Sequence, residues 1–281
     1  MTFEVIPTGA ALGAEIRGVD LSRPMDDRTF AAIERAYDDH GVLFFRNQRI
    51  TPQQQVAFTR RFGEIEFNIF GERWSVPDCP EIVVVSNITD DGKPIGIKRA
   101  GENWHSDMIY SPRPPRATML HGIEVPELHG LTLGDTAFAN AAAAYEALPD
   151  SMQRCIEGLK GVFDFTGRKR GEAPDPATVQ RYPPVEHPIV RTHSRTGVRC
   201  LYINRDDCTG IVGLPHDEAE ALIVALSDHV IKPEFLYRHR WRRGDIVMWD
   251  NCTVQHKAII DYDLPQRRLM HRLTIAGTVP K

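Results

Sequence analysis

No stretch of the sequence approaches the roughly 20 consecutive apolar residues that a membrane-spanning helix needs. The N-terminal segment MTFEVIPTGAALGAEIRGVDL also lacks the basic region followed by an apolar run that marks a secretory signal. Both absences argue against a membrane-bound or secreted protein. We therefore predict a cytoplasmic location.

An excess of charge of one sign is missing as well. The chain has 34 lysines and arginines against 38 aspartates and glutamates, for a formal net charge of -4. A broad electrostatic attraction to nucleic acid or to an anionic membrane is therefore not expected. Small molecules are the partners that we predict.

Closely spaced cysteine pairs are absent, and the cysteines are odd in number. This pattern suits a reducing compartment better than a disulfide framework, so we interpret the cysteines as structural. Internal repeats are also absent, and 281 residues are enough for a substantial core. We predict one domain over residues 1–281. The cysteines are Cys79, Cys155, Cys200, Cys208 and Cys252.

The first part of the chain carries two helical patterns. In DDRTFAAIERAYDDHG the apolar residues fall on one face, and Gly41 is a natural stop. In TPQQQVAFTRRFG, Thr51 and Gln54 predict a capping box, and Gly63 predicts the end of the helix. A strand, VLFFR, is expected between the two.

From about Glu81 onward, short β-branched runs alternate with clusters of Gly, Pro, Asn and Asp. Further helices are predicted at NAAAAYEALPDSMQRCIEGL, split near Pro149, and at HDEAEALIVALSDHV. SPRPPRA and the stretch from Arg168 to Pro184 are predicted loops, and long loops in a compact domain are often functional lids. The predicted fold is mainly β, an antiparallel sandwich or barrel with flanking helices. Its expected strands include EIVVVSN, VRCLYIN, DIVMWD and HRLTIAG.

The stretch NWHSDMIY places a histidine and an aspartate two residues apart. In an extended strand, His105 and Asp107 point to the same face and present an imidazole beside a carboxylate. Such a pair suits two ligands of one metal ion. A solvated surface pair is the commoner explanation, so a metal site needs a third ligand.

His256 is the best candidate for that third ligand. It closes GDIVMWDNCTVQH, in which the Asp250-Asn251 turn separates two strands, so its imidazole could face a barrel interior. A core histidine satisfied by a hydrogen bond is the alternative. Histidines in helical patterns or among charged neighbours are weaker candidates; these are His40, His187, His193, His216, His229, His239 and His271.

Two imidazoles and one carboxylate hold divalent iron on one face and leave positions open for a co-substrate and dioxygen, although a zinc hydrolase could use the same ligands. A binding group for an anionic co-substrate would favour iron. Arg268 and Arg272, in DYDLPQRRLMHRLTIAG, share one face of the expected strand. An arginine fork pairs bidentately with a carboxylate or sulfonate. Solvated basic residues near the C-terminus are the alternative.

With these residues in place, the sequence resembles the taurine dioxygenase and 2,4-D dioxygenase family of iron(II), 2-oxoglutarate-dependent oxygenases. The resemblance rests on the order and spacing of motifs over nearly the whole chain. The motifs are PTGAALGAEIRGVDL, GVLFFRNQRITPQQQVAFTRRFGE, NWHSD, GDTAF, AAYEALP, HPIVRTH, LYIN, RGDIVMWDN and LPQRRLMHR.

The resemblance implies a double-stranded β-helix, or jelly-roll, core with Fe(II) held by the catalytic residues His105, Asp107 and His256. It also implies that Arg268 and Thr136 bind 2-oxoglutarate, which O2 converts to succinate and CO2 as the substrate is hydroxylated. Association into a homodimer or homotetramer is expected on the same ground.

Arg272 matches the family arginine that faces the anionic group of the primary substrate, which we expect to be a sulfonate, a sulfate ester or a carboxylate such as an aryloxyalkanoate. The positions that match taurine-specific contacts hold Asn68, Gly71, Gly101 and Asp207. Two glycines in place of side chains predict a roomier pocket that recognises a small sulfonate less well. The alternatives are a taurine dioxygenase that releases sulfite and aminoacetaldehyde, a zinc hydrolase, and a catalytically silent binding protein.

Overall fold

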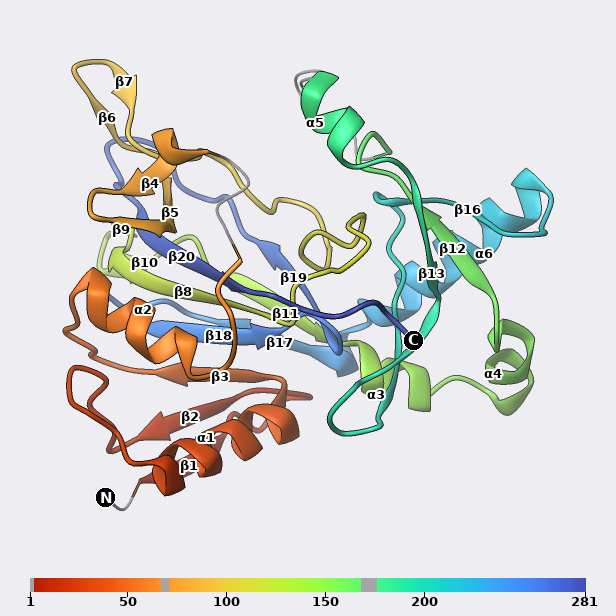
Figure 1. Cartoon of the computed structure of the whole chain (residues 1–281), viewed down its shortest axis with the longest axis horizontal. Helices are drawn as coiled ribbons and strands as arrows, with labels where there is room; N and C mark the ends of the chain where they lie inside the picture. The colour runs from red at the N-terminus through yellow and green to blue at the C-terminus, as the bar shows by residue number, and fades with distance from the viewer. Residues whose placement is uncertain (1–2, 67–70, 168–175) are drawn as a thin grey trace.

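The computed structural model describes residues 3–66, 71–167 and 176–281. Two antiparallel sheets face each other in it (Figure 1). The main sheet has the strand order β1-β2-β3-β18-β8-β20-β5-β4, and only β2 and β3 pair in parallel. The second sheet has the order β17-β11-β19. The main-sheet strands are β1 (Glu4–Pro7), β2 (Ala14–Arg17), β3 (Val42–Phe45), β4 (Ser75–Val76), β5 (Cys79–Ser86), β8 (Ala117–Glu124), β18 (Ile246–Asp250) and β20 (Leu269–Ile275); the others are β11 (Thr136–Asn140), β17 (Leu236–His239) and β19 (Val254–Ala258).

An apolar core fills the space between the two sheets. Phe44 of β3 and Trp249 of β18 reach into it from the main sheet, and Phe138 of β11 and Val254 of β19 reach into it from the second sheet. Alternation along each strand places these side chains inward and their neighbours outward. The predicted β sandwich, with the jelly-roll core that the family resemblance implied, is confirmed.

Two helices cover the outer face of the main sheet. Helix α1 (Asp27–His40) ends at Gly41, whose φ of 67° lets its N–H donate to the carbonyl of Tyr37. Helix α2 (Pro52–Arg60) has the predicted capping box between Thr51 and Gln54. It ends at Arg60, three residues before Gly63, where the sequence predicted its end. Apolar side chains of both helices pack on the main sheet in one buried cluster.

A third group of elements lies beyond the end of the second sheet (Figure 1). Pro149 separates two short helices, as predicted. The predicted loop from Arg168 to Pro184 contains a helix, and residues 168–175 lie outside the described ranges. These elements are α3 (Ala141–Glu146), α4 (Asp150–Ile156), α5 (Pro176–Arg181), α6 (His216–Val230), β12 (Lys160–Phe163), β13 (Val185–Pro188), β14 (Val190–Thr192), β15 (Arg199–Leu201) and β16 (Cys208–Ile211).

Short elements complete the described part of the chain. None of its helices combines the length and the apolar character needed to cross a membrane. The five cysteines form no disulfide. The remaining elements are β6 (Thr89–Asp90), β7 (Lys93–Pro94), β9 (Glu127–Leu128), β10 (Leu131–Thr132) and the 3-10 helices η1 (Glu72–Trp74) and η2 (Pro233–Phe235).

Candidate metal centre

Two histidines from distant parts of the chain meet at one short stretch of backbone pairing. The N–H of His256 donates to the carbonyl of His105 at 2.8 Å, and the N–H of His105 donates to the carbonyl of His256 at 3.1 Å. His256 lies in β19, which pairs with β11. The two imidazole rings are buried, and their centroids lie 4.1 Å apart. This isolated bridge places both imidazoles at the same point of the core.

Asp107 completes a group of three potential metal ligands. Its Oδ1 lies 3.6 Å from Nε2 of His105 and 3.8 Å from Nε2 of His256. One donor atom from each residue lies within 4.8 Å of the other two. In the described ranges no other group of three His, Cys, Asp or Glu residues meets that condition.

The local structure that brings His105 and Asp107 together is not the predicted extended strand. His105 forms only the single bridge to His256, and residues 107–110 form a turn in which Met108 has a φ of 46°. Strand alternation is therefore the wrong reason for their proximity. The bridge fixes His105, and the turn that follows folds Asp107 back beside it.

A ring of buried hydrogen bonds fixes the Asp107 carboxylate. The hydroxyl of Thr118 donates to Oδ2 of Asp107 at 2.6 Å, and Nδ2 of Asn251 donates to that hydroxyl at 3.1 Å. The backbone N–H of Asp107 donates to Oδ1 of Asn251 at 3.3 Å, and Nε1 of Trp249 donates to the same oxygen at 3.1 Å. Because Oδ2 is engaged by Thr118, Oδ1 is the carboxylate oxygen that faces the imidazoles.

The imidazole of His105 is oriented in a similar way. Its Nδ1 lies 2.7 Å from the carbonyl of Asn103. A carbonyl only accepts, so Nδ1 carries the proton and Nε2 is left with a lone pair. Such a bond to the distal ring nitrogen is typical of metal-binding histidines.

The charge of Asp107 is maintained by its neighbours. Burial favours the neutral acid, but Arg272 and the imidazoles of His256 and His105 outweigh it and hold the pKa of Asp107 well below its usual range. Nη2 of Arg272 lies 2.7 Å from Oδ1 of Asp107. The carboxylate is therefore ionised, which is the form that binds a metal ion.

Arg268 lies at the other end of the same cavity, directly before β20. It is buried, and its Nη1 donates to the carbonyl of Gly134. Burial lowers the pKa of Arg268. Among the described residues, no aspartate or glutamate forms an ion pair with it. Arg268 is thus a buried cation that faces a cavity without a carboxylate partner of its own.

The walls around Arg268 include residues that the sequence did not single out. The ring of Tyr262 lies 5.4 Å from the guanidinium carbon of Arg268. Gly134 has a φ of 72°, and a Cβ there would collide with Nη1 of Arg268. Nε1 of Trp241 donates to the hydroxyl of Thr136 at 3.0 Å. Gly134, in GDTAF, was the one sequence signal for this part of the wall, since a backbone that closely approaches a ligand-binding group often requires glycine.

One cavity connects the three potential ligands with both arginines. Its lining also includes Gly101, one of the predicted substrate-pocket positions. Gly101 has a φ of 79°, and a Cβ there would lie 3.1 Å from Cε1 of His105. The full lining is Val85, Ala100, Gly101, His105, Asp107, Leu120, Thr136, Trp249, His256, Ala258, Tyr262, Arg268 and Arg272.

The other predicted pocket positions do not line this cavity. Asn68 lies outside the described residues. Gly71 is exposed, and a Cβ there would meet no other atom within 4 Å. Asp207 is fully buried directly before β16, and its N–H donates to Oδ1 of Asn204 at 2.8 Å. Of the four positions, the structure brings only Gly101 to the candidate metal centre.

The donor set fits a divalent transition metal. Two imidazoles and one carboxylate with positions left open are typical of non-haem Fe(II) oxygenases, and zinc binds the same types of ligand. Nε2 of His105 and Oδ1 of Asp107 are both directed to one point, because their partner atoms Nδ1 and Oδ2 are engaged elsewhere. Arg268 favours the oxygenase, since a buried guanidinium in the same cavity is suited to an anionic co-substrate.

Comparisons with known proteins agree with this geometry. The family model described as "Taurine catabolism dioxygenase TauD, TfdA family" matches residues 4–274. The alpha-ketoglutarate-dependent 2,4-dichlorophenoxyacetate dioxygenase of Cupriavidus pinatubonensis is 35% identical over 98% of each chain. The alpha-ketoglutarate-dependent sulfate ester dioxygenase of Pseudomonas putida is 32% identical over 100% of this chain and 91% of its own.

A solved structure extends the comparison to the fold. The crystal structure of AAD-2 in complex with Mn(II) and N-oxalylglycine has a TM-score of 0.83 to this chain at 31% identity. The match covers 100% of this chain and 99% of that one. The similarity therefore includes the whole arrangement of elements around the candidate metal centre.

Proposed function

Since the chain belongs to the taurine catabolism dioxygenase TauD, TfdA family of Fe(II)- and 2-oxoglutarate-dependent dioxygenases, we propose that it hydroxylates a small organic anion held by Arg272. The main observation behind this proposal is the set of residues that line one cavity. Three potential metal ligands and two arginines line it together. A metal site alone would fit a hydrolase equally well, whereas a metal site beside two anion-binding groups fits a co-substrate and a substrate that are both anions.

In this proposal His105, Asp107 and His256 hold the iron. Bound iron supplies the activation of O2 that is coupled to conversion of 2-oxoglutarate to succinate and CO2. The protein contributes orientation: Thr118 engages Oδ2 of Asp107, and Asn103 engages Nδ1 of His105. Three protein ligands would leave positions on a bound metal ion open for small-molecule ligands.

Arg268 and Thr136 are proposed to bind the distal carboxylate of 2-oxoglutarate. Arg268 is buried in the cavity wall, so a carboxylate would pair with it in surroundings that exclude water. The hydroxyl oxygen of Thr136 accepts from Trp241, which leaves the hydroxyl hydrogen for donation to a ligand. Both residues lie directly at the cavity, at opposite walls of the sandwich.

Arg272 is proposed to orient the primary substrate. Its Nη2 contacts Asp107, but its buried Nε has no hydrogen-bond partner among the described residues. A sulfonate, sulfate or carboxylate group would therefore find part of the guanidinium available next to the metal centre. Gly101 leaves space on the His105 side, and Asn68 and Asp207 stay candidates for substrate contacts from sequence only.

The substrate class follows from the relatives and from this arginine. The names of two similar proteins specify an aryloxyacetate and a sulfate ester. We propose that this chain acts on such an anion. Taurine is the second candidate, because the matching family is named for it.

The test is succinate formation by the iron-loaded protein under air, with 2-oxoglutarate and one candidate substrate at a time. The panel comprises taurine, longer alkanesulfonates, alkyl sulfates, aryloxyalkanoates and amino acids. Stimulation by aryloxyalkanoates or alkyl sulfates supports the proposal, and stimulation by taurine alone replaces it with the second candidate. Substrate turnover without O2 or 2-oxoglutarate would indicate a hydrolase, and ligand binding without any succinate would indicate a silent binding protein.

Three further properties belong to the same proposal. We propose a cytoplasmic enzyme, consistent with five cysteines that form no disulfide. We propose one dioxygenase domain over residues 1–281, because the family model spans residues 4–274. We also propose a homodimer or homotetramer, which light scattering of the purified protein would test.

A further inference from the structure

A second cavity lies outside the candidate metal centre. Its volume is about 650 Å³, and it shares no lining residue with the metal-centre cavity. Its walls come from the loop before β8, from β14 with the turn that follows, and from the last residues of the chain. The lining residues are Arg113, Arg191, Thr192, His193, Ser194, Gly197, Thr278, Val279 and Lys281.

The charged side chains that line this second cavity are all cationic. Arg113, Arg191 and Lys281 contribute cationic side chains, and no aspartate or glutamate is among the lining residues. Thr192, Ser194 and Thr278 add hydroxyl groups. His193 belongs to the wall, but its Nε2 is already engaged by Oδ2 of Asp250 at 3.2 Å. The backbone carboxyl group of Lys281 also lies at this wall, where one oxygen accepts from the N–H of Thr192 at 2.7 Å, so three cationic side chains face one carboxylate. Such an excess of donors is suited to an anion.

Arg191 is the most buried of the three cationic side chains, with a relative exposure of 5%. Its guanidinium carbon lies 4.8 Å from the ring of Tyr202, and its Nη1 has no hydrogen-bond partner among the described residues. No ion pair joins it to a described aspartate or glutamate. A buried charge without a counter-charge is costly, so such groups are normally paired or serve a ligand.

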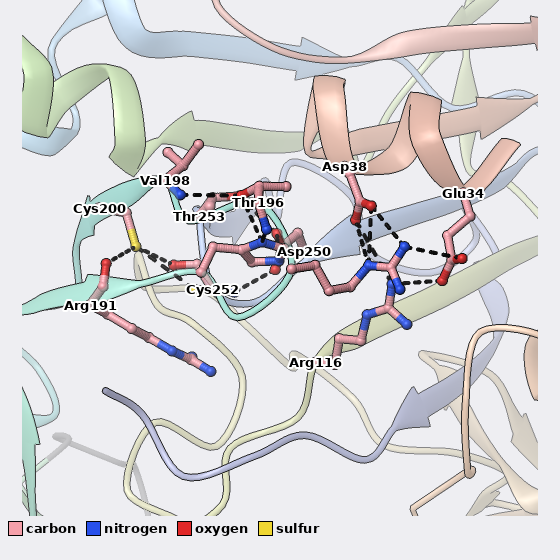
Figure 2. A network of polar contacts seen from close by, with 12 residues as sticks. Glu34, Asp38, Arg116, Arg191, Thr196, Val198, Cys200, Asp250, Cys252 and Thr253 are labelled. Atoms are coloured by element: carbon pink, nitrogen blue, oxygen red, sulfur yellow. Dashed lines mark hydrogen bonds and ion pairs between the residues drawn. The ribbon is translucent and has the colours of Figure 1, made fainter. Parts of the chain in front are cut away.

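The neighbouring polar network shows that pairing is the rule around Arg191 (Figure 2). Nη2 of Arg116 lies 3.0 Å from Glu34, and Nη2 of Arg195 lies 2.9 Å from Asp38. In Figure 2 the dashed lines reach Arg191 only at its backbone carbonyl, which accepts from the thiol of Cys200.

The nearest described carboxylate in this network is not free to serve Arg191. Asp250 accepts from the backbone N–H of Cys252 at 2.7 Å and from the hydroxyl of Thr253 at 3.0 Å, in addition to the contact with His193. Asp250 is therefore engaged by other groups, and no ion pair joins the guanidinium of Arg191 to a described carboxylate.

From these observations we propose that the second cavity is a binding site for a small oxyanion, held by Arg191 at its base and by Arg113 and Lys281 at its rim. The shared chemistry is a carboxylate, sulfate or phosphate head group, which a guanidinium binds through parallel hydrogen bonds. Such a head group can belong to a free inorganic anion or to a dicarboxylate such as succinate. The site is separate from Arg268 and Arg272, and the inference does not depend on the proposed function.

The experiment is calorimetric titration of the full-length protein with sodium sulfate, with sodium phosphate and with succinate, each at constant ionic strength. We expect saturable binding of one molecule per chain by at least one of these probes. The probe that binds most tightly distinguishes an inorganic anion from a dicarboxylate. Arg191→Met and the double variant Arg113→Ala/Lys281→Ala should weaken this binding at least about tenfold, since each removes charge-assisted hydrogen bonds.

Two controls locate the site. Arg195→Ala removes a nearby arginine that is already paired with Asp38 and Glu34, and it should leave binding unchanged. Arg268→Met removes the cation of the metal-centre cavity and should also leave this binding unchanged. The double variant changes exposed side chains, so it keeps the test decisive if Arg191→Met does not fold.

Three results would overturn the proposal. Equal affinities in all variants would show that no such site exists. Loss of binding only in Arg268→Met would place the anion in the metal-centre cavity. A change of oligomeric mass in the double variant, without any dependence on anion, would show that the second cavity is covered by another copy of the chain.

Discussion

The two ends of the metal-centre cavity are built in different ways. At the Arg268 end, the wall consists of β20, β11 and the aromatic side chains of Trp241 and Tyr262. At the Arg272 end, the neighbours are the turn of residues 107–110 and the segment at Glu66, whose N–H donates to the carbonyl of Thr274 at 2.8 Å. Arg272 itself lies in β20 and Arg268 directly before it, so the two ends differ in their neighbours: a paired strand and two aromatic rings at Arg268, a turn and a loop segment at Arg272.

This difference explains why the reaction class is easier to infer than the substrate. Strand residues are fixed by register and packing, so Thr136 of β11, which lines the same cavity as Arg268, has a position set by the sheet. Loops tolerate substitution and carry specificity. Four positions expected near the substrate, Asn68, Gly71, Gly101 and Asp207, all lie outside the helices and strands or outside the described residues.

The two arginines also differ in whether a carboxylate pairs with them. Arg268 has no carboxylate partner among the described residues, whereas Arg272 contacts Oδ1 of Asp107 at 2.7 Å. An incoming anion at Arg268 meets an unpaired cation. An incoming anion at Arg272 would share the guanidinium with Asp107, a proposed metal ligand. An anion bound at Arg272 would therefore act directly on the carboxylate of a proposed metal ligand.

The largest expected effect comes from removing the group that both ends share. Asp107→Ala should lower iron-dependent succinate formation by about 10³-fold or more, because loss of a ligand exceeds the 10-fold to 100-fold cost of losing a group that merely supports one. Succinate would be quantified after incubation with Fe(II), 2-oxoglutarate and the best substrate. Asp90→Ala, an exposed aspartate, is the matched control. Full activity in the Asp107 variant would rule out this metal assignment.

Next in size is the Arg268 end. Arg268→Met should raise the KM for 2-oxoglutarate about 100-fold, since a charge-assisted bidentate contact is lost in a buried site. The KM for the primary substrate should change little. The adjacent Arg267 is exposed and paired with Glu124 at 2.9 Å, so Arg267→Met is the control. An unchanged KM for 2-oxoglutarate would place the co-substrate elsewhere.

A smaller effect is expected at the Arg272 end. Arg272→Met should raise the KM for the primary substrate about 30-fold and affect the KM for 2-oxoglutarate much less, because only one of the two anions loses its partner. Steady-state kinetics with each substrate varied in turn would separate the two constants. Arg272→Lys keeps the charge and should restore part of the loss. Equal changes in both constants would show that the two ends do not act separately.

The smallest effect should come from the support of Asp107. Thr118→Val preserves the shape of the side chain but removes the donor to Oδ2 of Asp107, so it should weaken Fe(II) binding about tenfold. Thr118→Ser retains the hydroxyl and should bind iron normally. Equilibrium dialysis measures iron affinity without relying on turnover. The same affinity in the valine variant would mean that the hydrogen bond does not orient the carboxylate.

Several features of the fold could be predicted from local sequence. Helix α2 follows from Thr51, Pro52 and Gln54, because a capping box is made by residues three positions apart. Helix α1 ends at Gly41, where a positive φ is needed. The end of α2 was predicted less well, since Gly63 was expected to stop a helix that ends at Arg60. Helix ends depend on weak local preferences that neighbouring contacts easily override.

The candidate site was predicted as a set of residues but not as a geometry. His105, Asp107 and His256 do lie together, yet the expected strand at NWHSDMIY is a single bridge followed by a turn. Thr118 and Tyr262 gave no clear signal, because a threonine in a strand and a tyrosine in a loop have many roles. The contacts of Thr118 with Asp107 and of Gly134 with Arg268 join segments more than ten residues apart, whereas Tyr262 lies six residues before Arg268.

The sequence by itself determined the kinds of group that the protein can offer: two imidazoles and a carboxylate for a metal, and arginines for anions. It also determined the short-range features, whose causes lie within a few neighbouring residues. Only the tertiary structure decided that Oδ1 of Asp107 faces the imidazoles, that Arg268 lacks a carboxylate partner among the described residues, and that Arg191 borders a second cavity. The physical reason is that orientation and burial depend on contacts between distant segments, which no local pattern specifies.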